Sequence, residues 1–123
     1  MKYLRSLKEG YGNIDAKTSG GDVEINSKNG KISAGTSGGD IGVKYFGDNK
    51  GVELYTSGGS IKVQLSSDFS ADVLFKTSGG SIKNKFNNSR ATEITKNKFE
   101  GKFNDGGAEF TAKTSGGSIY IYD

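Results

Sequence analysis

The sequence predicts an all-β fold, a single-stranded parallel β-helix (β-solenoid) of about six coils with 18–21 residues each. The main observation is the tetrapeptide Thr-Ser-Gly-Gly, which occurs five times in 123 residues, starting at Thr18, Thr36, Thr56, Thr77 and Thr114. These starting points lie 18, 20, 21 and 37 residues apart. Units this short leave no room for the helical crossovers of α/β proteins, and the recurrence of like residues at the same offsets favours parallel stacking.

A strand is predicted before each Thr-Ser-Gly-Gly corner. With Thr as position zero, positions −4 and −2 are apolar in every copy, which is the period of a strand with one buried face. Thr has the same parity, so we expect the hydroxyl groups of Thr18, Thr36, Thr56 and Thr77 to point inward and form a hydrogen-bonded ladder. The apolar pairs are Ile14 and Ala16, Ile32 and Ala34, Val52 and Leu54, Val73 and Phe75, and Phe110 and Ala112.

Each corner contains two adjacent glycines, which we expect to supply positive φ angles and a sharp bend between two sheets. Gly-rich turns also form hairpins, so an antiparallel array of hairpins is the alternative. The conserved offsets within each unit favour the parallel solenoid and a structural role for the corners. The corner glycines are Gly20, Gly21, Gly38, Gly39, Gly58, Gly59, Gly79, Gly80, Gly116 and Gly117.

A second strand is predicted after each corner, because positions +5 and +7 are apolar in four copies and only Asn84 departs from the pattern. The 37-residue interval is about twice the others, so it predicts a degenerate coil at about residues 86–105. Its aromatic side chains are expected to cap the solenoid or form a local core. They are Phe86, Phe99, Phe103 and Phe110.

The pattern Gly-Xaa-Ile…Thr-Ser-Gly-Gly-(Asp/Ser)-Ile-Xaa-Val resembles a bacterial adhesin family, itself a domain of unknown function, over about residues 10–123. Residues 101–121 are similar to the closing coils of that family. The resemblance implies a right-handed parallel β-helix in a cell-envelope or extracellular protein, and it carries over no catalytic residues. Residues 1–123 are expected to form a single domain, a fragment of a larger protein.

Composition argues against several classes of function. The chain has no His and no Cys, which removes the commonest general base and thiol chemistry. Its formal net charge of +3 is small for a nucleic-acid-binding protein. Asp22 and Asp40 follow Gly-Gly as in calcium-binding β-rolls, but Ser60, Ser81 and Ser118 take that place in the other copies. We expect no metal site, no cofactor, no enzymatic activity, no membrane-inserting segment and no signal peptide in this chain.

The outward positions +6 and +8 suggest a binding surface. In stacked coils they form a flat strip with several lysines, and two tyrosines are expected to close one end of it. The residues predicted to bind a ligand are Lys44, Lys62, Lys83, Lys85, Tyr120 and Tyr122. The leading hypothesis is a non-enzymatic extracytoplasmic adhesion module that binds acidic glycans or a host or cell-surface protein. The alternatives are a scaffold module that self-associates through its ends and, less favoured, a carbohydrate-active enzyme.

Overall fold

The computed structural model describes residues 6–11, 14–28, 30–46, 50–87 and 89–123. In these ranges the chain forms thirteen strands, and no helix that could span a membrane is found there. The strands are β1 (Ser6–Tyr11), β2 (Ile14–Thr18), β3 (Val23–Lys28), β4 (Ile32–Thr36), β5 (Ile41–Phe46), β6 (Val52–Thr56), β7 (Ile61–Leu65), β8 (Ala71–Thr77), β9 (Ile82–Lys85), β10 (Ser89–Ile94), β11 (Lys98–Phe103), β12 (Glu109–Thr114) and β13 (Ile119–Tyr122).

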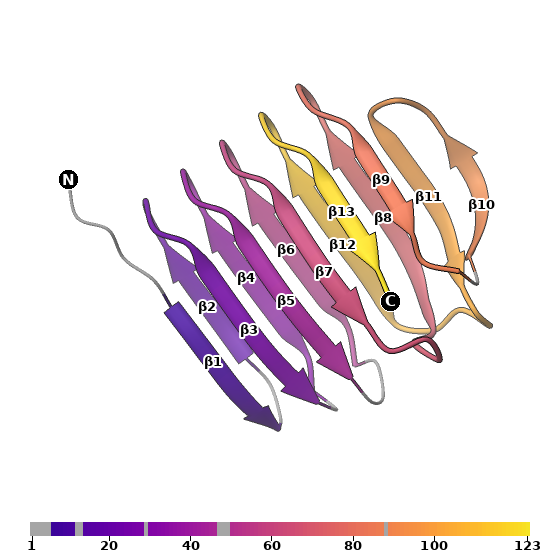
Figure 1. Ribbon diagram of the computed structural model, residues 1–123, viewed down its shortest axis with the longest axis horizontal. Helices are drawn as coiled ribbons and strands as arrows, with labels where there is room; N and C mark the ends of the chain where they lie inside the picture. Colours follow the sequence, from indigo (N-terminus) through magenta and orange to yellow (C-terminus); the bar gives the residue numbers. More distant parts are fainter. Residues whose placement is uncertain (1–5, 12–13, 29, 47–49, 88) are drawn as a thin grey trace.

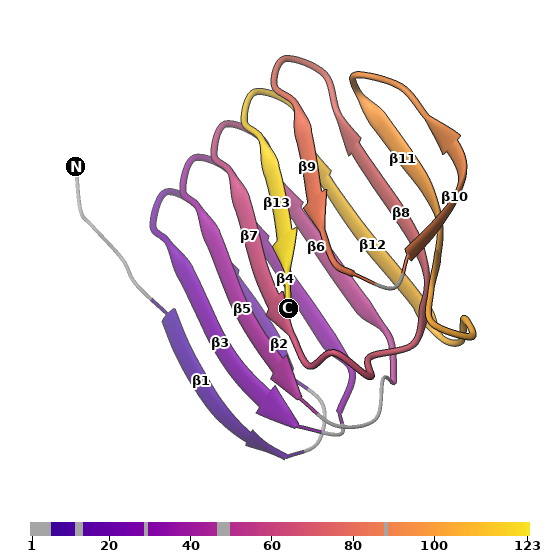
Figure 2. The ribbon, with the colours of Figure 1, turned by 45° about the vertical axis from the view of Figure 1, so that its right-hand side comes forward.

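The strands form two sheets that lie face to face (Figures 1 and 2). Sheet A has the order β1-β3-β5-β7-β13-β9, and sheet B the order β10-β11-β8-β12-β6-β4-β2. Pairing is parallel throughout sheet A and from β8 to β2 in sheet B. Each Thr-Ser-Gly-Gly segment connects a strand of sheet B to a strand of sheet A. The predicted all-β fold with parallel strands, of the β-solenoid kind, is therefore confirmed.

The core lies between the two sheets and consists of columns of like side chains. Ile41, Ile61 and Ile119 occupy the same register position on adjacent strands, and each is at most 1% exposed. Outward neighbours such as Lys62 are exposed. The period-two pattern therefore assigns the two faces of these strands correctly.

The coils do not stack in chain order. Strand β13 lies between β7 and β9, and β12 lies between β6 and β8, so the last Thr-Ser-Gly-Gly unit fills the interior of the stack. Figure 1 shows the C-terminus on β13 within the front sheet, one strand in from the edge strand β9. The expectation that Tyr120 and Tyr122 close one end of the molecule is therefore wrong.

Residues 86–105 form a different structure from the degenerate coil expected there. Strands β10 and β11 pair with each other in antiparallel register, and β11 pairs antiparallel with β8. Gly101 makes this hairpin possible, because a Cβ atom there would lie 2.1 Å from the carbonyl oxygen of Arg90. The ring of Phe103, on β11, stacks on the ring of Phe86, and the two ring centroids lie 4.3 Å apart. The four phenylalanines of the prediction are buried and continue the core that lies between the two sheets.

The Thr hydroxyl groups connect successive corners. Thr56 Oγ1 donates to the carbonyl oxygen of Gly39 in the neighbouring corner at 2.8 Å and accepts from the backbone N–H of Gly59 at 3.3 Å. Thr36, Thr77 and Thr114 make equivalent bonds. The ladder therefore alternates Thr hydroxyl groups with Gly carbonyl groups, and these four threonines are buried.

The corner glycines are needed for a reason other than positive φ. The described residues with positive φ are Asn104, Gly51, Gly106 and Gly107, none of which belongs to a corner. A Cβ atom on Gly59, however, would lie 1.9 Å from the carbonyl oxygen of Gly39. The second glycine of each stacked corner is therefore required by close backbone approach, and the sequence-based expectation was wrong on this point.

Candidate functional site

The six predicted binding residues lie on the outer surface of sheet A, which we call the lysine–tyrosine face. Strands β7, β13 and β9 place Lys62, Tyr120 and Lys83 in one row, because these residues are direct partners across the sheet. A second row, two residues further along, contains Lys44, Gln64, Tyr122 and Lys85 on β5, β7, β13 and β9. Adjacent residues in each row lie about 4.8 Å apart.

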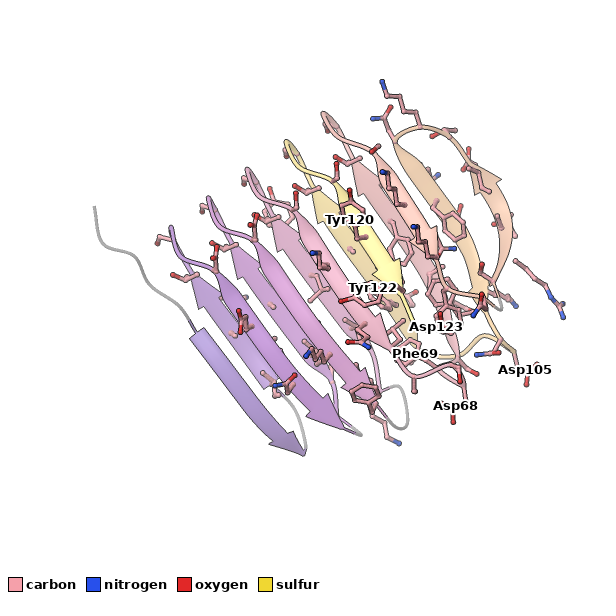
Figure 3. The ribbon with its side chains drawn as sticks, viewed as in Figure 1. Asp68, Phe69, Asp105, Tyr120, Tyr122 and Asp123 are labelled. Carbon is pink, nitrogen blue, oxygen red and sulfur yellow. The ribbon has the colours of Figure 1, made fainter. Side chains whose placement is uncertain are left out.

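The interior position of β13 places Tyr120 between Lys62 and Lys83, and Tyr122 between Gln64 and Lys85. Figure 3 shows Tyr120 and Tyr122 along β13, one strand in from the edge of sheet A. Lys83 Nζ lies 5.5 Å from the centroid of the Tyr120 ring, which is a cation–π contact. Tyr120 is 37% exposed, so part of its ring remains open to a ligand.

The lysines of this face are not neutralised by carboxylates. Lys44, Lys62, Lys83 and Lys85 are exposed, and none forms an ion pair within the described ranges 14–28, 30–46, 50–87 and 89–123. Like charges on neighbouring strands repel each other, and such a surface attracts polyanions.

Gly42 opens a hollow in the lysine–tyrosine face. It lies in the first row between Glu24 and Lys62, and it has no side chain to fill the space between them. The result is a hollow of about 270 Å³ that Lys44, Lys62 and Tyr122 help to line. Gly42 occupies the outward position +6 of its repeat, and the sequence analysis assigned it no role. Its missing side chain is the signal that could have located the hollow.

The acidic residues after the corners have a structural role. Asp22 Oδ1 accepts the backbone N–H of Asp40 at 2.9 Å, and Asp40 Oδ1 accepts that of Ser60 at 2.8 Å. The hydroxyl groups of Ser60 and Ser118 accept the equivalent N–H groups of the next corners, both at 3.2 Å. Asp and Ser can both occupy this position because both place an oxygen within reach of the neighbouring coil. The described residues contain no cluster of three or more potential metal ligands.

Sequence analysis missed the outward positions of sheet B. The residue before each Thr points outward there, and it is Lys17, Gly35, Tyr55, Lys76 or Lys113. Three lysines and a tyrosine at one offset of the repeat were visible in the sequence.

Comparison with protein families identifies the chain. The family model described as Toastrack, DUF4097, matches residues 10–122. The chain belongs to the Toastrack family. Membership of this family agrees with the β-solenoid-like fold of the chain. Toastrack is a domain of unknown function, so membership assigns no ligand. Comparisons with curated proteins and with solved structures gave no match.

Proposed function

We propose that this Toastrack domain is a non-enzymatic adhesion module of the bacterial cell envelope that binds acidic glycans through its lysine–tyrosine face. We also propose that the β-solenoid is right-handed, because crossover connections between parallel strands are usually right-handed. The observation that carries it is the row Lys62–Tyr120–Lys83, in which two lysines without ion pairs flank an exposed ring.

The spacing of this face suits a repeating ligand. A polymer with regularly placed carboxylate or sulfate groups can contact lysines on several strands, while sugar rings pack against Tyr120 and Tyr122. Each contact in water is weak, since exposed ion pairs contribute about 0–1 kcal/mol. Affinity would come from several contacts along one chain and from several copies of the module.

A glycan array probed with the tetramerised domain tests this proposal. We expect selective binding to uronate-containing or sulfated glycans that is lost when Lys44, Lys62, Lys83 and Lys85 are replaced with Ser. The control variant replaces Lys17, Lys50, Lys96 and Lys102 with Ser, which removes the same charge from other surfaces. Equal loss in both variants, or no binding to acidic glycans, would contradict the proposal.

One observation favours a second function, scaffolding by strand addition at the β2 edge. Thr18 Oγ1 is buried and has no hydrogen-bond partner among the residues that the structure describes, whereas the other four corner threonines donate to a neighbouring corner. Strand β2 is the last strand of sheet B on that side. The acceptors in the other copies are glycine carbonyl groups of the neighbouring corner, so a coil whose strand pairs with β2 and whose corner stacks on Thr18 would supply the missing carbonyl. Concentration-dependent association in light scattering, abolished by a Pro at Lys17, would support this role; a monomer at high micromolar concentration would exclude self-association.

A further inference from the structure

A second group of lysines lies on sheet B, on the opposite side of the molecule from the lysine–tyrosine face. Lys113 lies between Tyr55 and Lys76 because β12 is inserted between β6 and β8. The hairpin then places Lys98 beside Lys76. Lys113, Lys76 and Lys98 thus occupy three adjacent strands, about 4.8 Å apart. Chain order alone does not predict this group.

The three ammonium groups differ in their partners. Lys98 Nζ lies 2.8 Å from Glu93 Oε1 and 3.8 Å from Glu100 Oε1. The hydrogen bond between Lys98 and Glu93 lowers the pKa of Glu93 and raises that of Lys98. Lys76 and Lys113 are exposed and form no ion pair with any residue that the structure describes. Two such neighbouring cations favour a bound anion.

A hollow of about 380 Å³ lies at these lysines, and Tyr55 lines it as well. Tyr55 is 49% exposed, and its hydroxyl oxygen lies 3.3 Å from Ser57 Oγ in a hydrogen bond that helps to orient the ring. Further hydroxyl and amide groups at the hollow could bond to a sugar. They belong to Ser78, Asn97 and Ser115.

We propose that this hollow binds one acidic sugar residue. Its carboxylate would lie between Lys76 and Lys113, and the C–H face of its ring would pack against Tyr55. A hollow of this size is at the small end of ligand pockets, which suits a single sugar ring better than a polymer segment. The site is separate from the lysine–tyrosine face, so a molecule that uses both surfaces connects two glycan chains.

NMR titration of the ¹⁵N-labelled protein with glucuronate tests the site. We expect saturable shifts at the amides of residues 55, 76–78, 97 and 113–115. Glucose has the ring without the charge, and it is expected to cause no saturable shift. Sulfate has the charge without the ring, and we expect it to bind at least about fivefold more weakly. Equal affinity for sulfate and glucuronate would overturn the assignment of a sugar.

Paired variants locate the binding. Replacing Lys76 and Lys113 with Ser is expected to raise the Kd for glucuronate about tenfold. Replacing Lys17 and Lys50 with Ser removes the same charge from positions outside both sites and should change the Kd, read from the amides of the hollow, less than about twofold. Equal weakening would show a general charge effect and overturn the proposal. Melting temperatures verify that both variants fold, and array binding by the Lys76/Lys113 variant shows separately whether the lysine–tyrosine face still functions.

Discussion

The units before the β7–β8 connection (β2 to β7) and the units after it (β8–β9 and β12–β13) have similar coils but stack them differently. In the first region, successive units along the chain are neighbours in both sheets. In the second, the unit β12–β13 lies between β6–β7 and β8–β9. The corner contacts hardly differ: Thr56 Oγ1 reaches Gly39 O at 2.8 Å across 17 residues, and Thr114 Oγ1 reaches Gly59 O at 2.7 Å across 55 residues. The shape of the coil, rather than its place in the chain, determines the stacking geometry.

The connection between β7 and β8 separates the two regions. Strand β8 pairs with β12 rather than with β6, so this connection passes over one strand position in the stack. Phe69 lies within it and is 1% exposed. Its ring packs edge-on against Tyr45 and Phe110, with centroid distances of 5.4 and 5.9 Å. The connection thus contributes to the core while leaving space for the inserted unit.

Disulfide cross-linking should distinguish the observed stacking order from stacking in chain order by an all-or-none result. The chain has no cysteine, so pairs can be introduced without competing thiols. Cysteines at Lys62 and Tyr120 would be direct partners on adjacent strands and should form a disulfide on mild oxidation. Cysteines at Lys62 and Lys83 flank β13, about 10 Å apart, and should remain free. Stacking in chain order would produce the reverse result, which mass spectrometry of the oxidised variants would detect.

Gly117→Ala tests the close approach between the inserted unit and its neighbour. Its Cβ atom would lie 2.0 Å from the carbonyl oxygen of Gly59, so the stacked corners would have to separate. We expect a loss of about 3 kcal/mol in the free energy of unfolding, measured by urea denaturation. Gly116→Ala is the matched control, because its nearest contact of 3.5 Å is ordinary and should lower stability by less than about 1 kcal/mol. Equal effects at the two positions would contradict the stacking explanation.

Thr114→Val removes a hydroxyl group while keeping the shape of the side chain. It leaves the carbonyl of Gly59 and the N–H of Gly117 without this partner, so we expect a loss of about 1–3 kcal/mol. Thr56→Val should have a similar effect, because its corner makes the same contacts in chain order. Thr18→Val should be neutral or slightly stabilising, since Thr18 Oγ1 has no hydrogen-bond partner to lose in the part of the chain that the structure describes. Thermal unfolding of the three variants measures the ranking, and a large loss for Thr18→Val would exclude this role of the ladder.

The strands and their buried faces could be predicted because period-two patterning is a local property. The positions of Ile61 and Ile119 relative to their own corners were sufficient to place both in the core. The order of stacking could not be predicted in the same way. All units present like residues at like offsets, so Ile61 packs equally well beside Ile82 or Ile119, and local patterns cannot distinguish these arrangements.

The hairpin and the second site had weaker signals in the sequence. Strand β10 has no alternation of buried and exposed residues, and Ile94 is 67% exposed, so this strand lacks the period-two pattern by which the other strands could be predicted. Tyr55 and Lys113 are 58 residues apart in the chain and become partners only through the insertion of β12. Their offset from Thr was visible in the sequence, but their contact was not.

The interior position of β12 and β13 has a consequence for synthesis on the ribosome. A growing chain emerges from its N-terminus, so β6 to β11 are available before the strands that join them. Until residues 109–122 emerge, β7 and β9 have no partner between them, and their apolar columns at Ile61 and Ile82 lack the cover that Ile119 later supplies. The N-terminal coils can assemble as they are made, whereas the coils around β8 and β9 are completed only when β12 and β13 have been translated.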